Sequence, residues 1–258
     1  MDNTTELKTD KLSQILQAND YVTERLYPRA SASLYLHVAD LREALDPFQT
    51  SERIRLLDYG CGGSPYRSLF KNSQYVRADF TPCEGLDFLL PEDSSVPEGA
   101  SSFDMVLSTQ VLEHVPDPTH YVAECFRVLK PGGSLLLTTH GIFEDHGCPY
   151  DYHRWTADGL RLLLERAGFK IRAAKKLTCG PRALCFLINQ GIWQLQAPRS
   201  SWFGVAIRGL HRLWRLRPCW LNRCADRYFK NCSIVDASEA KHTMYIALLM
   251  HAERPPLE

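Results

Sequence analysis

From about residue 53 onward, the chain alternates short apolar segments with helical stretches, and turn residues separate the two. The apolar segments are expected as strands over seven ranges: 54–58, 75–78, 86–90, 103–108, 134–138, 170–176 and 244–251. Helices are expected from residue 65, over 118–128 and over 156–167. Strands that alternate with helices form parallel sheets with helices on both faces. The pattern therefore predicts an α/β fold with a mostly parallel, seven-stranded sheet.

The segments on either side of this alternation predict additions to the sheet. Residues 12–46 are expected to be helical, because apolar residues recur at helical spacing until Pro47 ends the pattern. Residues 181–230 hold nine basic residues and one acidic residue, together with four of the five tryptophans, and their periodicity is helical. The expected organisation is an N-terminal helical cap (1–52), a core (53–180), a basic, tryptophan-rich helical insert (181–240), and the final strand with a tail (241–258).

Composition places the chain among ordinary globular proteins. Its 258 residues carry 30 basic and 30 acidic side chains and are enough for one large domain with an appendage. Nine cysteines without a CxxC pair are typical of a reducing compartment rather than of a disulfide framework or a zinc site. Residues 1–11 are polar, and no apolar run reaches the length of about eighteen residues that a membrane span needs. We expect a cytoplasmic protein, with peripheral attachment to the inner membrane face through the insert as a further option.

The turn after the first predicted strand indicates a nucleotide site. Gly60 and Gly62 let the backbone bend sharply and let a ligand lie against it. Ser64 and Pro65 suit the N-cap and first position of a helix that opens towards that ligand. Asp79 ends the second strand, where an acidic side chain can accept hydrogen bonds from both hydroxyls of a ribose. Because Pro65 stands where a dinucleotide fingerprint needs its third glycine, the turn disfavours a nicotinamide dinucleotide.

Further motifs follow this turn in a fixed order. They are SFDMV at 102–106, QVLEHV at 110–115 and FRVLKPGG at 126–133. Together with the glycine-rich turn and Asp79, the series resembles the class I S-adenosylmethionine-dependent methyltransferases over about residues 50–180. The resemblance implies a Rossmann-like fold and S-adenosylmethionine as the cofactor.

The same resemblance implies cofactor-binding roles along one edge of the sheet. The backbone at Gly60 and Gly62 would hold the methionine part of the cofactor, and Asp79 would hold the ribose. Asp58 would order the turn from below. Near the adenine we expect Asp93, with Asp87 and Glu92 as competitors. The expected cofactor residues are Asp58, Gly60, Cys61, Gly62, Asp79, Phe80, Asp93, Thr109 and Gln110.

A closer resemblance concerns the acceptor of the methyl group. Residues 62–70, 108–114, 139–141 and 149–156 look like methyltransferases found alongside bacterial glycan and lipid-linked sugar biosynthesis. This resemblance implies O-methylation of a sugar, a lipid-linked molecule or another small acceptor, for which a histidine is the natural general base. We rank His146 first, then His140, then His114. The expected acceptor-binding residues are Tyr150, Tyr152, His153, Arg154 and Trp155.

Several alternatives stay open on the sequence. A metal site is not expected, because the His, Asp and Glu residues of 140–155 lack a helical i, i+4 pair. The insert can dock on anionic lipid or on a phosphate-bearing acceptor, or it can pack as a cap with its tryptophans inward; nucleic acid is not expected. The alternatives to a methyltransferase are a nicotinamide-dependent oxidoreductase and a cofactor-binding but catalytically silent partner subunit.

Overall fold

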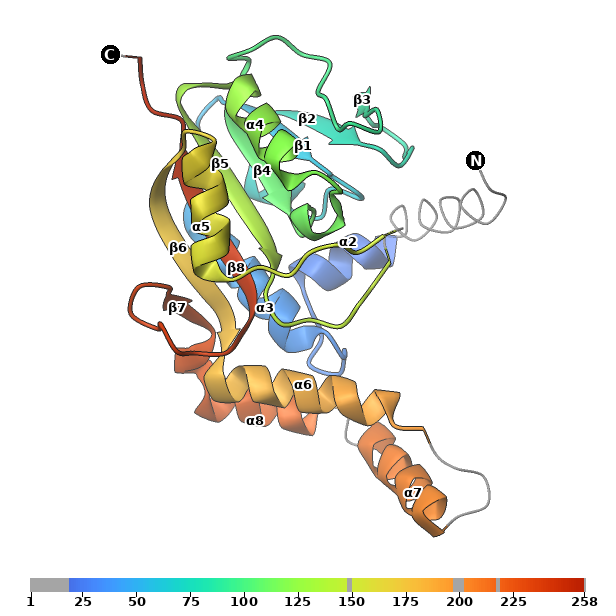
Figure 1. Cartoon of the computed structure of the whole chain (residues 1–258). Helices are drawn as coiled ribbons and strands as arrows, with labels where there is room; N and C mark the ends of the chain where they lie inside the picture. Colours follow the sequence, from blue (N-terminus) through green and yellow to red (C-terminus); the bar gives the residue numbers. More distant parts are fainter. Residues whose placement is uncertain (1–18, 148–149, 197–201, 217–218, 258) are drawn as a thin grey trace.

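The computed structural model describes residues 19–147, 150–196, 202–216 and 219–257. They form an eight-stranded sheet flanked by helices (Figure 1). From one edge to the other the strands are β3 (Phe88–Leu89), β2 (Gln74–Asp79), β1 (Arg55–Tyr59), β4 (Phe103–Thr109), β5 (Leu129–His140), β8 (Tyr245–Glu253), β6 (Lys170–Cys179) and β7 (Ile234–Asp236). The first part of the predicted cap, residues 1–18, and Pro149 of the acceptor motif lie outside the described residues.

Most of the sheet is parallel. Strands β3, β2, β1, β4 and β5 pair in parallel, which confirms the α/β sheet predicted from the alternation. Strand β8 lies between β5 and β6 and runs antiparallel to both. The sheet has one strand more than predicted, because β7 pairs with β6 from within the segment 181–240 that was predicted to be helical. Three residues are too few for an alternating pattern to be recognised in a sequence.

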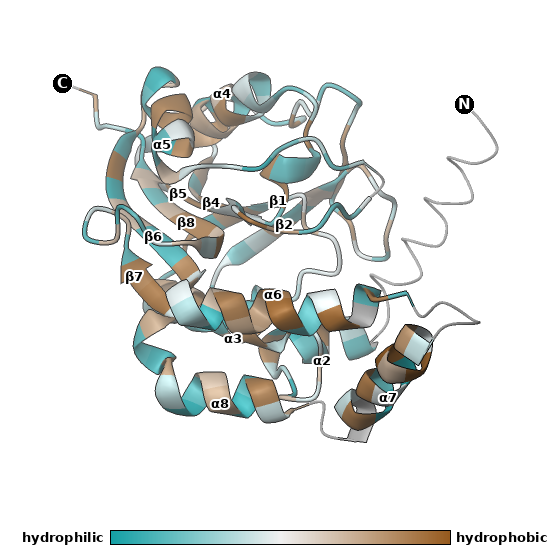
Figure 2. Cartoon of the chain, turned by 60° about the horizontal axis from the view of Figure 1, so that its bottom comes forward, coloured by the Kyte–Doolittle hydropathy of each residue, from teal (hydrophilic) through white to brown (hydrophobic). Residues whose placement is uncertain are grey.

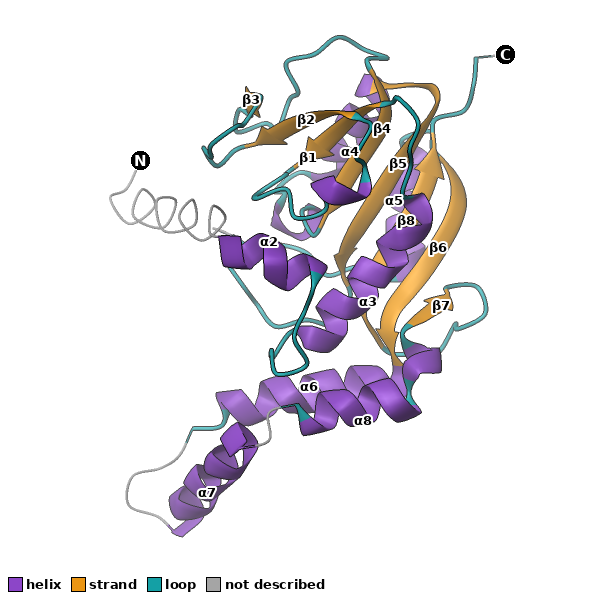
Figure 3. Cartoon of the chain, turned by 180° about the vertical axis from the view of Figure 1, so that it is seen from behind, coloured by secondary structure: helices purple, strands orange, loops and turns teal. Residues whose placement is uncertain are grey.

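Helices cover both faces of the sheet (Figures 1 and 3). Helices α4 (Pro118–Val128) and α5 (Ala157–Arg166) pack on one face. Helix α3 (Tyr35–Leu45) packs on the other face, with α2 (Asn19–Leu26) beside it. Capping explains why the first pair begins where predicted: the Asp117 carboxylate accepts hydrogen bonds from two backbone N–H groups of α4, and the Thr156 hydroxyl accepts one from α5.

Two helical predictions are corrected by the structure. Only a 3-10 turn, η2 (Arg67–Leu69), follows β1, so no α-helix starts at Pro65. The reason is Ser64, whose φ of 48° is incompatible with the extended backbone of an N-cap. Its hydroxyl accepts a hydrogen bond from Arg77 Nε instead, at 2.8 Å. The helix predicted over 12–46 is divided where α2 ends at Leu26, shortly before Pro28.

The insert forms three helices at one end of the sheet. Helices α6 (Gly180–Gln194) and α8 (Trp220–Tyr228) lie side by side, and α7 (Trp202–Leu216) extends away from the body (Figures 1 and 3). Figure 2 shows hydrophobic residues along α7. Among the described residues, no helix is long and apolar enough to cross a membrane. The remaining 3-10 turns are η1 (Asp46–Phe48), η3 (Leu112–His114) and η4 (Lys230–Cys232).

A buried arginine fastens the insert to the rest of the fold. The guanidinium of Arg182, on α6, is fully buried and donates two hydrogen bonds of 2.8 Å to the carboxylate of Asp40 on α3. A third hydrogen bond, of 2.9 Å, joins Arg182 to Asp226 on α8. Hydroxyl groups complete the cluster, since Thr178 of β6 donates to Asp40 and Tyr35 donates to Asp226. One cluster therefore connects α3, β6, α6 and α8.

Replacing Arg182 with leucine should lower the free energy of unfolding by about 3–5 kcal/mol, because Asp40 would remain buried without its counter-charge. Adding Asp40→Leu should recover part of that loss. Chemical denaturation measures both effects. The control is Arg172→Leu, which removes an ion pair with Glu253 at the surface and should cost much less, because exposed ion pairs contribute little. Equal losses for the two arginine variants would contradict a structural role for the buried cluster.

Candidate active site

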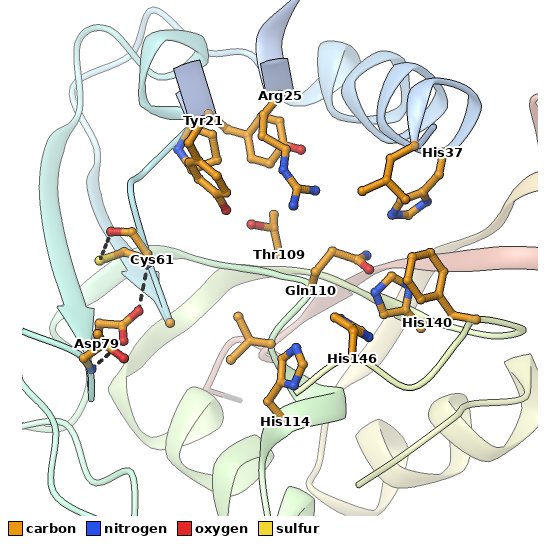
Figure 4. A pocket seen from close by; sticks show the side chains of 18 of the residues that line it. Tyr21, Arg25, His37, Cys61, Asp79, Thr109, Gln110, His114, His140 and His146 are labelled. Carbon is orange, nitrogen blue, oxygen red and sulfur yellow. Dashed lines mark hydrogen bonds between the residues drawn. The ribbon is translucent and has the colours of Figure 1, made fainter. Parts of the chain in front are cut away.

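A cavity of about 320 Å³ opens at the carboxyl ends of the parallel strands, the edge at which open α/β sheets bind their ligands (Figure 4). Its walls come from the turn after β1, the ends of β2, β4 and β5, and helices α2 and α3. Seven of the nine expected cofactor residues line it: Gly60, Cys61, Gly62, Asp79, Phe80, Thr109 and Gln110. The three expected bases line it as well, on the side away from Asp79: His114, His140 and His146.

The turn after β1 depends on glycine at its first position. Gly60 has a φ of 76°, and its N–H donates a 2.8 Å hydrogen bond to the carbonyl of Ala78 on β2. A Cβ atom at Gly60 would lie 2.5 Å from Cγ1 of Val111, which also lines the cavity. Only glycine permits both the left-handed backbone and this close approach. The contact between the turn after β1 and the segment after β4 therefore fixes this part of the cavity wall.

Asp79 closes the same end of the cavity. One carboxylate oxygen accepts a 2.8 Å hydrogen bond from the N–H of Gly62, and the other accepts one of 2.8 Å from the N–H of Thr81. The side chain is almost fully buried, and this burial raises its pKa despite the two backbone donors. Each carboxylate oxygen has a second lone pair, so the group can hold the turn and still accept a hydrogen bond from a hydroxyl group of a ligand.

The two remaining cofactor candidates lie outside the cavity lining. Asp58 is buried beneath the turn and accepts a 2.7 Å hydrogen bond from the Tyr75 hydroxyl; burial raises its pKa to about 6. This position fits the expected ordering role. Asp93 is exposed, and its carboxylate accepts a hydrogen bond from the N–H of Ser95. The structure therefore does not bring Asp93 to the site in the way that an adenine-binding role requires.

The three histidines form a cluster at the opposite end. The ring centroid of His146 lies 4.9 Å from that of His114 and 5.0 Å from that of His140. His140 is 3% exposed, and burial lowers its pKa well below the usual value. Burial also lowers the pKa of His114. Both rings are therefore neutral near pH 7, the state in which an imidazole can accept a proton or bind a metal.

A buried carboxylate stands behind this cluster. Glu113 is fully buried, and burial raises its pKa to about 7. Its Oε2 accepts a 2.8 Å hydrogen bond from the Thr139 hydroxyl. Its Oε1 lies 3.2 Å from Nε2 of His140 and 4.0 Å from Nε2 of His114. Glu113 belongs to the motif at 110–115 and was not among the predicted site residues, although it stands beside His114 just after β4.

The expected acceptor-binding segment fixes its own loop instead of lining the cavity. Backbone N–H groups of Tyr152 and His153 donate to the carbonyl of Glu113, and that of Trp155 donates to His140. Five expected residues, Tyr150, Tyr152, His153, Arg154 and Trp155, are absent from the lining of the described cavity. Arg154 forms two hydrogen bonds of 2.5 and 2.6 Å with Asp151, three residues earlier. The side chain of Arg154 therefore holds the loop, whereas the side chains of Tyr150 and Tyr152 are exposed.

Helices α2 and α3 contribute lining residues that the sequence analysis missed. They are Tyr21, Arg25, Leu34 and His37, all within the segment expected only as a cap. His37 is 1% exposed, its ring centroid lies 5.3 Å from that of His140, and burial lowers its pKa to about 3. A histidine within the apolar pattern of α3 was the available signal. Its neighbours depend on how α3 packs, which the periodicity of one helix does not specify.

Comparison with protein families decides what kind of domain contains this site. Residues 32–174, more than half of the chain, match the family model described as a methyltransferase domain. The chain belongs to the methyltransferase-domain family. The matched range contains the glycine turn, Asp79 and all three histidines. The predicted class I methyltransferase resemblance, with S-adenosylmethionine as its cofactor, is thereby confirmed, and the family favours it over a nicotinamide-dependent oxidoreductase.

Curated relatives of this methyltransferase-family chain are named for ubiquinone biosynthesis. A ubiquinone biosynthesis O-methyltransferase of Xanthomonas oryzae pv. oryzae is 37% identical over 101 residues, which are 33% of this chain and 42% of the relative. One from Cereibacter sphaeroides is 31% identical over 137 residues, 46% of this chain and 50% of the relative. The similarity thus spans about half the length of these relatives.

Solved structures share the fold of this methyltransferase-family chain. The crystal structure of the cyclase SpnF superposes with a TM-score of 0.53 at 22% identity, covering 86% of this chain and 83% of that one. A Burkholderia thailandensis 1,6-didemethyltoxoflavin-N1-methyltransferase with bound S-adenosylhomocysteine gives a TM-score of 0.50 at 16% identity, covering 98% and 88%. At these identities the likeness concerns the fold alone.

Substituting Gly60 by alanine should destabilise this methyltransferase-family domain more than the same change at Gly132. Both glycines have positive φ, but a Cβ at Gly132 meets nothing within 4 Å, whereas one at Gly60 meets Val111. Overpacking of this kind costs about 1–3 kcal/mol beyond the backbone strain that the two variants share. Thermal and chemical unfolding of the pair measure the difference. Val111→Ala added to Gly60→Ala should reduce it, and an unchanged difference would show that the loop contact is not responsible.

Proposed function

We propose that this chain transfers the methyl group of S-adenosylmethionine to a hydroxyl oxygen of a small or lipid-linked acceptor, with a sugar as one such acceptor. The observation that supports this most is the arrangement of the cavity. The glycine turn and Asp79 form one side, and three histidines, of which His114 and His140 are buried more deeply than His146, form the other (Figure 4). A cofactor held by the turn and Asp79 would leave the histidine side for the acceptor.

The proposed reaction needs alignment, exclusion of water and a place for one proton. The acceptor oxygen attacks the methyl carbon, the carbon–sulfur bond breaks, and S-adenosylhomocysteine leaves. The hydroxyl proton passes to the histidine side, where His146 is the most accessible of the three rings. Its Nδ1 lies 3.3 Å from Oδ2 of Asp151. Although burial opposes it, Arg154 holds the pKa of Asp151 at about 2, so a carboxylate charge is present to support a protonated ring.

The curated relatives support oxygen as the methylated atom, because both are named O-methyltransferases. Both are also named for ubiquinone biosynthesis, which supports a small-molecule acceptor. A cyclase shares this fold, so the same architecture hosts different chemistry. The proposal therefore depends on the cavity and its side chains, and single-turnover methylation of a hydroxyl acceptor separates it from a catalytically silent subunit.

Changing Asp79 to asparagine should weaken binding of S-adenosylhomocysteine about tenfold or more, because a hydrogen bond to an ionised group contributes about 1.5–3 kcal/mol. Calorimetric titration of the full chain measures this. The matched control is Asp93→Asn, the same change at an exposed carboxylate outside the cavity lining, which should leave the Kd unchanged. NADH should not compete. A loss of affinity in the Asp93 variant but not in the Asp79 variant would contradict the proposed cofactor site.

We further propose that α7 attaches the protein to an anionic membrane surface, where it would meet a lipid-linked acceptor. One side of α7 is strongly exposed and apolar: Trp202 is 82% exposed, Leu213 67% and Val205 62%. Arg208 and Arg212 lie next to this stripe by helical spacing. The opposite side contacts α6, where the indole of Trp214 donates a 3.0 Å hydrogen bond to Asn189. An exposed apolar stripe flanked by arginines suits an interfacial helix at anionic lipid.

The expectation that the insert packs its tryptophans inward describes only part of it. Trp214 is partly buried against α6, whereas Trp202 and Trp220 are exposed, at 82% and 56%. The side chain of Trp193 lies outside the described residues. The exposed pair, and not the basic charge alone, supports the membrane proposal over a simple cap.

Sedimentation with vesicles containing phosphatidylglycerol tests this second proposal. The double substitution Trp202→Ser and Leu213→Ser should reduce the bound fraction at least tenfold, because burying each of these side chains in lipid contributes about 1.5–3 kcal/mol. Leu162→Ser is the control, since Leu162 is an equally ordinary exposed leucine, on α5 and 48% exposed. Wild-type binding should fall at high salt and on neutral vesicles. Equal binding by the double variant and the wild type would refute the role of α7.

A further inference from the structure

We infer that Glu113, His114 and His146 form a binding site for one divalent transition-metal ion, which faces the acceptor side of the cavity. The inference rests on the proposed function only for what the metal would do, since the geometry of the ligands is independent of it. Each of the three residues offers one ligand atom, and these atoms all lie within 4.8 Å of one another. Two of the three residues, His114 and His146, also line the cavity.

The distances are close to those of a ligand set. Zinc binds nitrogen and oxygen ligands at about 2.0–2.2 Å, which places ligands of one ion about 3–3.5 Å apart. The Oε1 of Glu113 and the Nε2 of His114 lie 4.0 Å apart. Closure by about 1 Å would therefore complete the set. The three ligands lie in η3 and in the loop after β5, outside the strands of the sheet.

An unpartnered buried oxygen points independently to a ligand. Glu113 is fully buried, and its Oε1 has no hydrogen-bond partner, although Nε2 of His140 lies 3.2 Å away outside hydrogen-bonding geometry. The other oxygen, Oε2, is satisfied by Thr139. Buried polar atoms normally have a partner, and a carboxylate oxygen without one is costly. A cation between Glu113 and the two histidines would provide that partner.

Hydrogen bonds leave the ligand nitrogen of His114 available. Its Nδ1 lies 2.6 Å from the carbonyl oxygen of Tyr150, which can only accept, so the proton is on Nδ1 and the lone pair is on Nε2. Metal-binding histidines typically donate their other ring N–H to a carbonyl or carboxylate in this way. The loop residues expected to bind the acceptor thus acquire a different role, since the backbone of Tyr150 orients His114.

His146 is oriented by the same kind of support. Its Nδ1 lies 3.3 Å from the Glu144 carbonyl and 3.3 Å from Oδ2 of Asp151. The backbone N–H of His146 also donates to Asp151, and Arg154 fixes that carboxylate through two hydrogen bonds. With the proton on Nδ1, the Nε2 of His146 carries the lone pair. Both histidines therefore present ligand nitrogens with supporting contacts already formed.

Two imidazoles and one carboxylate favour zinc or a similar ion over magnesium or calcium, which prefer oxygen ligands. Three protein ligands leave at least one position for another ligand. In the proposed reaction an acceptor hydroxyl would occupy it, where the charge of the ion lowers the pKa of the hydroxyl. The hydroxyl proton would pass to His140, the neutral ring that lines the same end of the cavity, while the oxygen attacks the methyl carbon, the carbon–sulfur bond breaks and S-adenosylhomocysteine departs. His146 then acts as a ligand and not as the base.

These three ligands do not form a helical i, i+4 pair, the spacing whose absence led us to expect no metal site. They come from η3, which follows β4, and from the loop after β5. Neighbouring parallel strands bring their carboxyl ends together, so residues 113, 114 and 146 meet at one edge of the sheet. Metal ligands that are adjacent only in the fold carry no fixed spacing in the sequence.

Titration of the chelator-treated full chain with Co²⁺ and Zn²⁺ tests the site without any turnover. We expect one ion per chain, with visible cobalt bands of a nitrogen and oxygen ligand set and no thiolate charge-transfer band. Glu113→Gln and His146→Ala should each weaken binding of the ion at least tenfold, while His120→Ala, on α4, should leave the affinity unchanged. Because Glu113 is buried, its variant can lose the fold, so thermal unfolding is measured in parallel. His146 is partly exposed, so its variant tests the site even if the Glu113 variant unfolds.

Three results would overturn the site: no stoichiometric binding, binding that persists in both variants, or a thiolate spectrum that points to the cysteines. Titration of the same samples with S-adenosylhomocysteine separates this inference from the proposed function. Cofactor binding without metal binding would reject only the metal site. Metal binding without cofactor binding would reject the proposed function and leave the metal site standing.

Discussion

The contact on which the rest of the structure depends is the buried pair of Arg182 and Asp40. A fully buried guanidinium is tolerated only when its charge is matched, and here two carboxylates match it. Because Asp40 belongs to α3, the pair fixes the helix that also carries His37 into the cavity wall. Because Arg182 belongs to α6, it fixes the insert to the same helix. One electrostatic cluster therefore sets the position of α3, which forms part of the cavity wall, and the position of the insert.

The cavity itself combines two kinds of construction. On the side of Asp79 the wall is backbone: Gly60 and Gly62 form a turn whose N–H groups donate to β2 and to Asp79. On the opposite side the wall is made of side chains, among them the neutral rings of His114 and His140, with the buried Glu113 behind them. Backbone geometry requires glycine at particular places and permits little variation, whereas side chains on loops can change without disturbing the sheet. This division is why a fold of this kind can keep one cofactor and accept many partners for it.

Much of this arrangement could be predicted from the sequence, and the failures have physical causes. Capping residues and apolar periodicity located α4 and α5, and the order of motifs located the turn, Asp79 and the three histidines. The prediction of a helix after Pro65 was wrong because Ser64 has a left-handed backbone, which the residue type does not reveal. The acceptor-binding role of residues 150–155 stays a prediction, because polar residues look the same in a sequence whether they bind a ligand or, as with Arg154, hold a loop. His37 and Glu113 were missed because their neighbours come from distant segments, which no local pattern records.

Strand β8 has a consequence for the order in which the molecule assembles. It lies between β5 and β6, yet more than sixty residues of chain separate its start at Tyr245 from the end of β6 at Cys179. During synthesis on the ribosome, β5 and β6 therefore have no β8 to pair with until the whole insert has been made. Pairing across so long a separation is slow, and open edges attract other chains. The insert, whose helices α6 and α8 pack against each other, therefore lies in the chain between β6 and β8, two strands that pair with each other in the sheet.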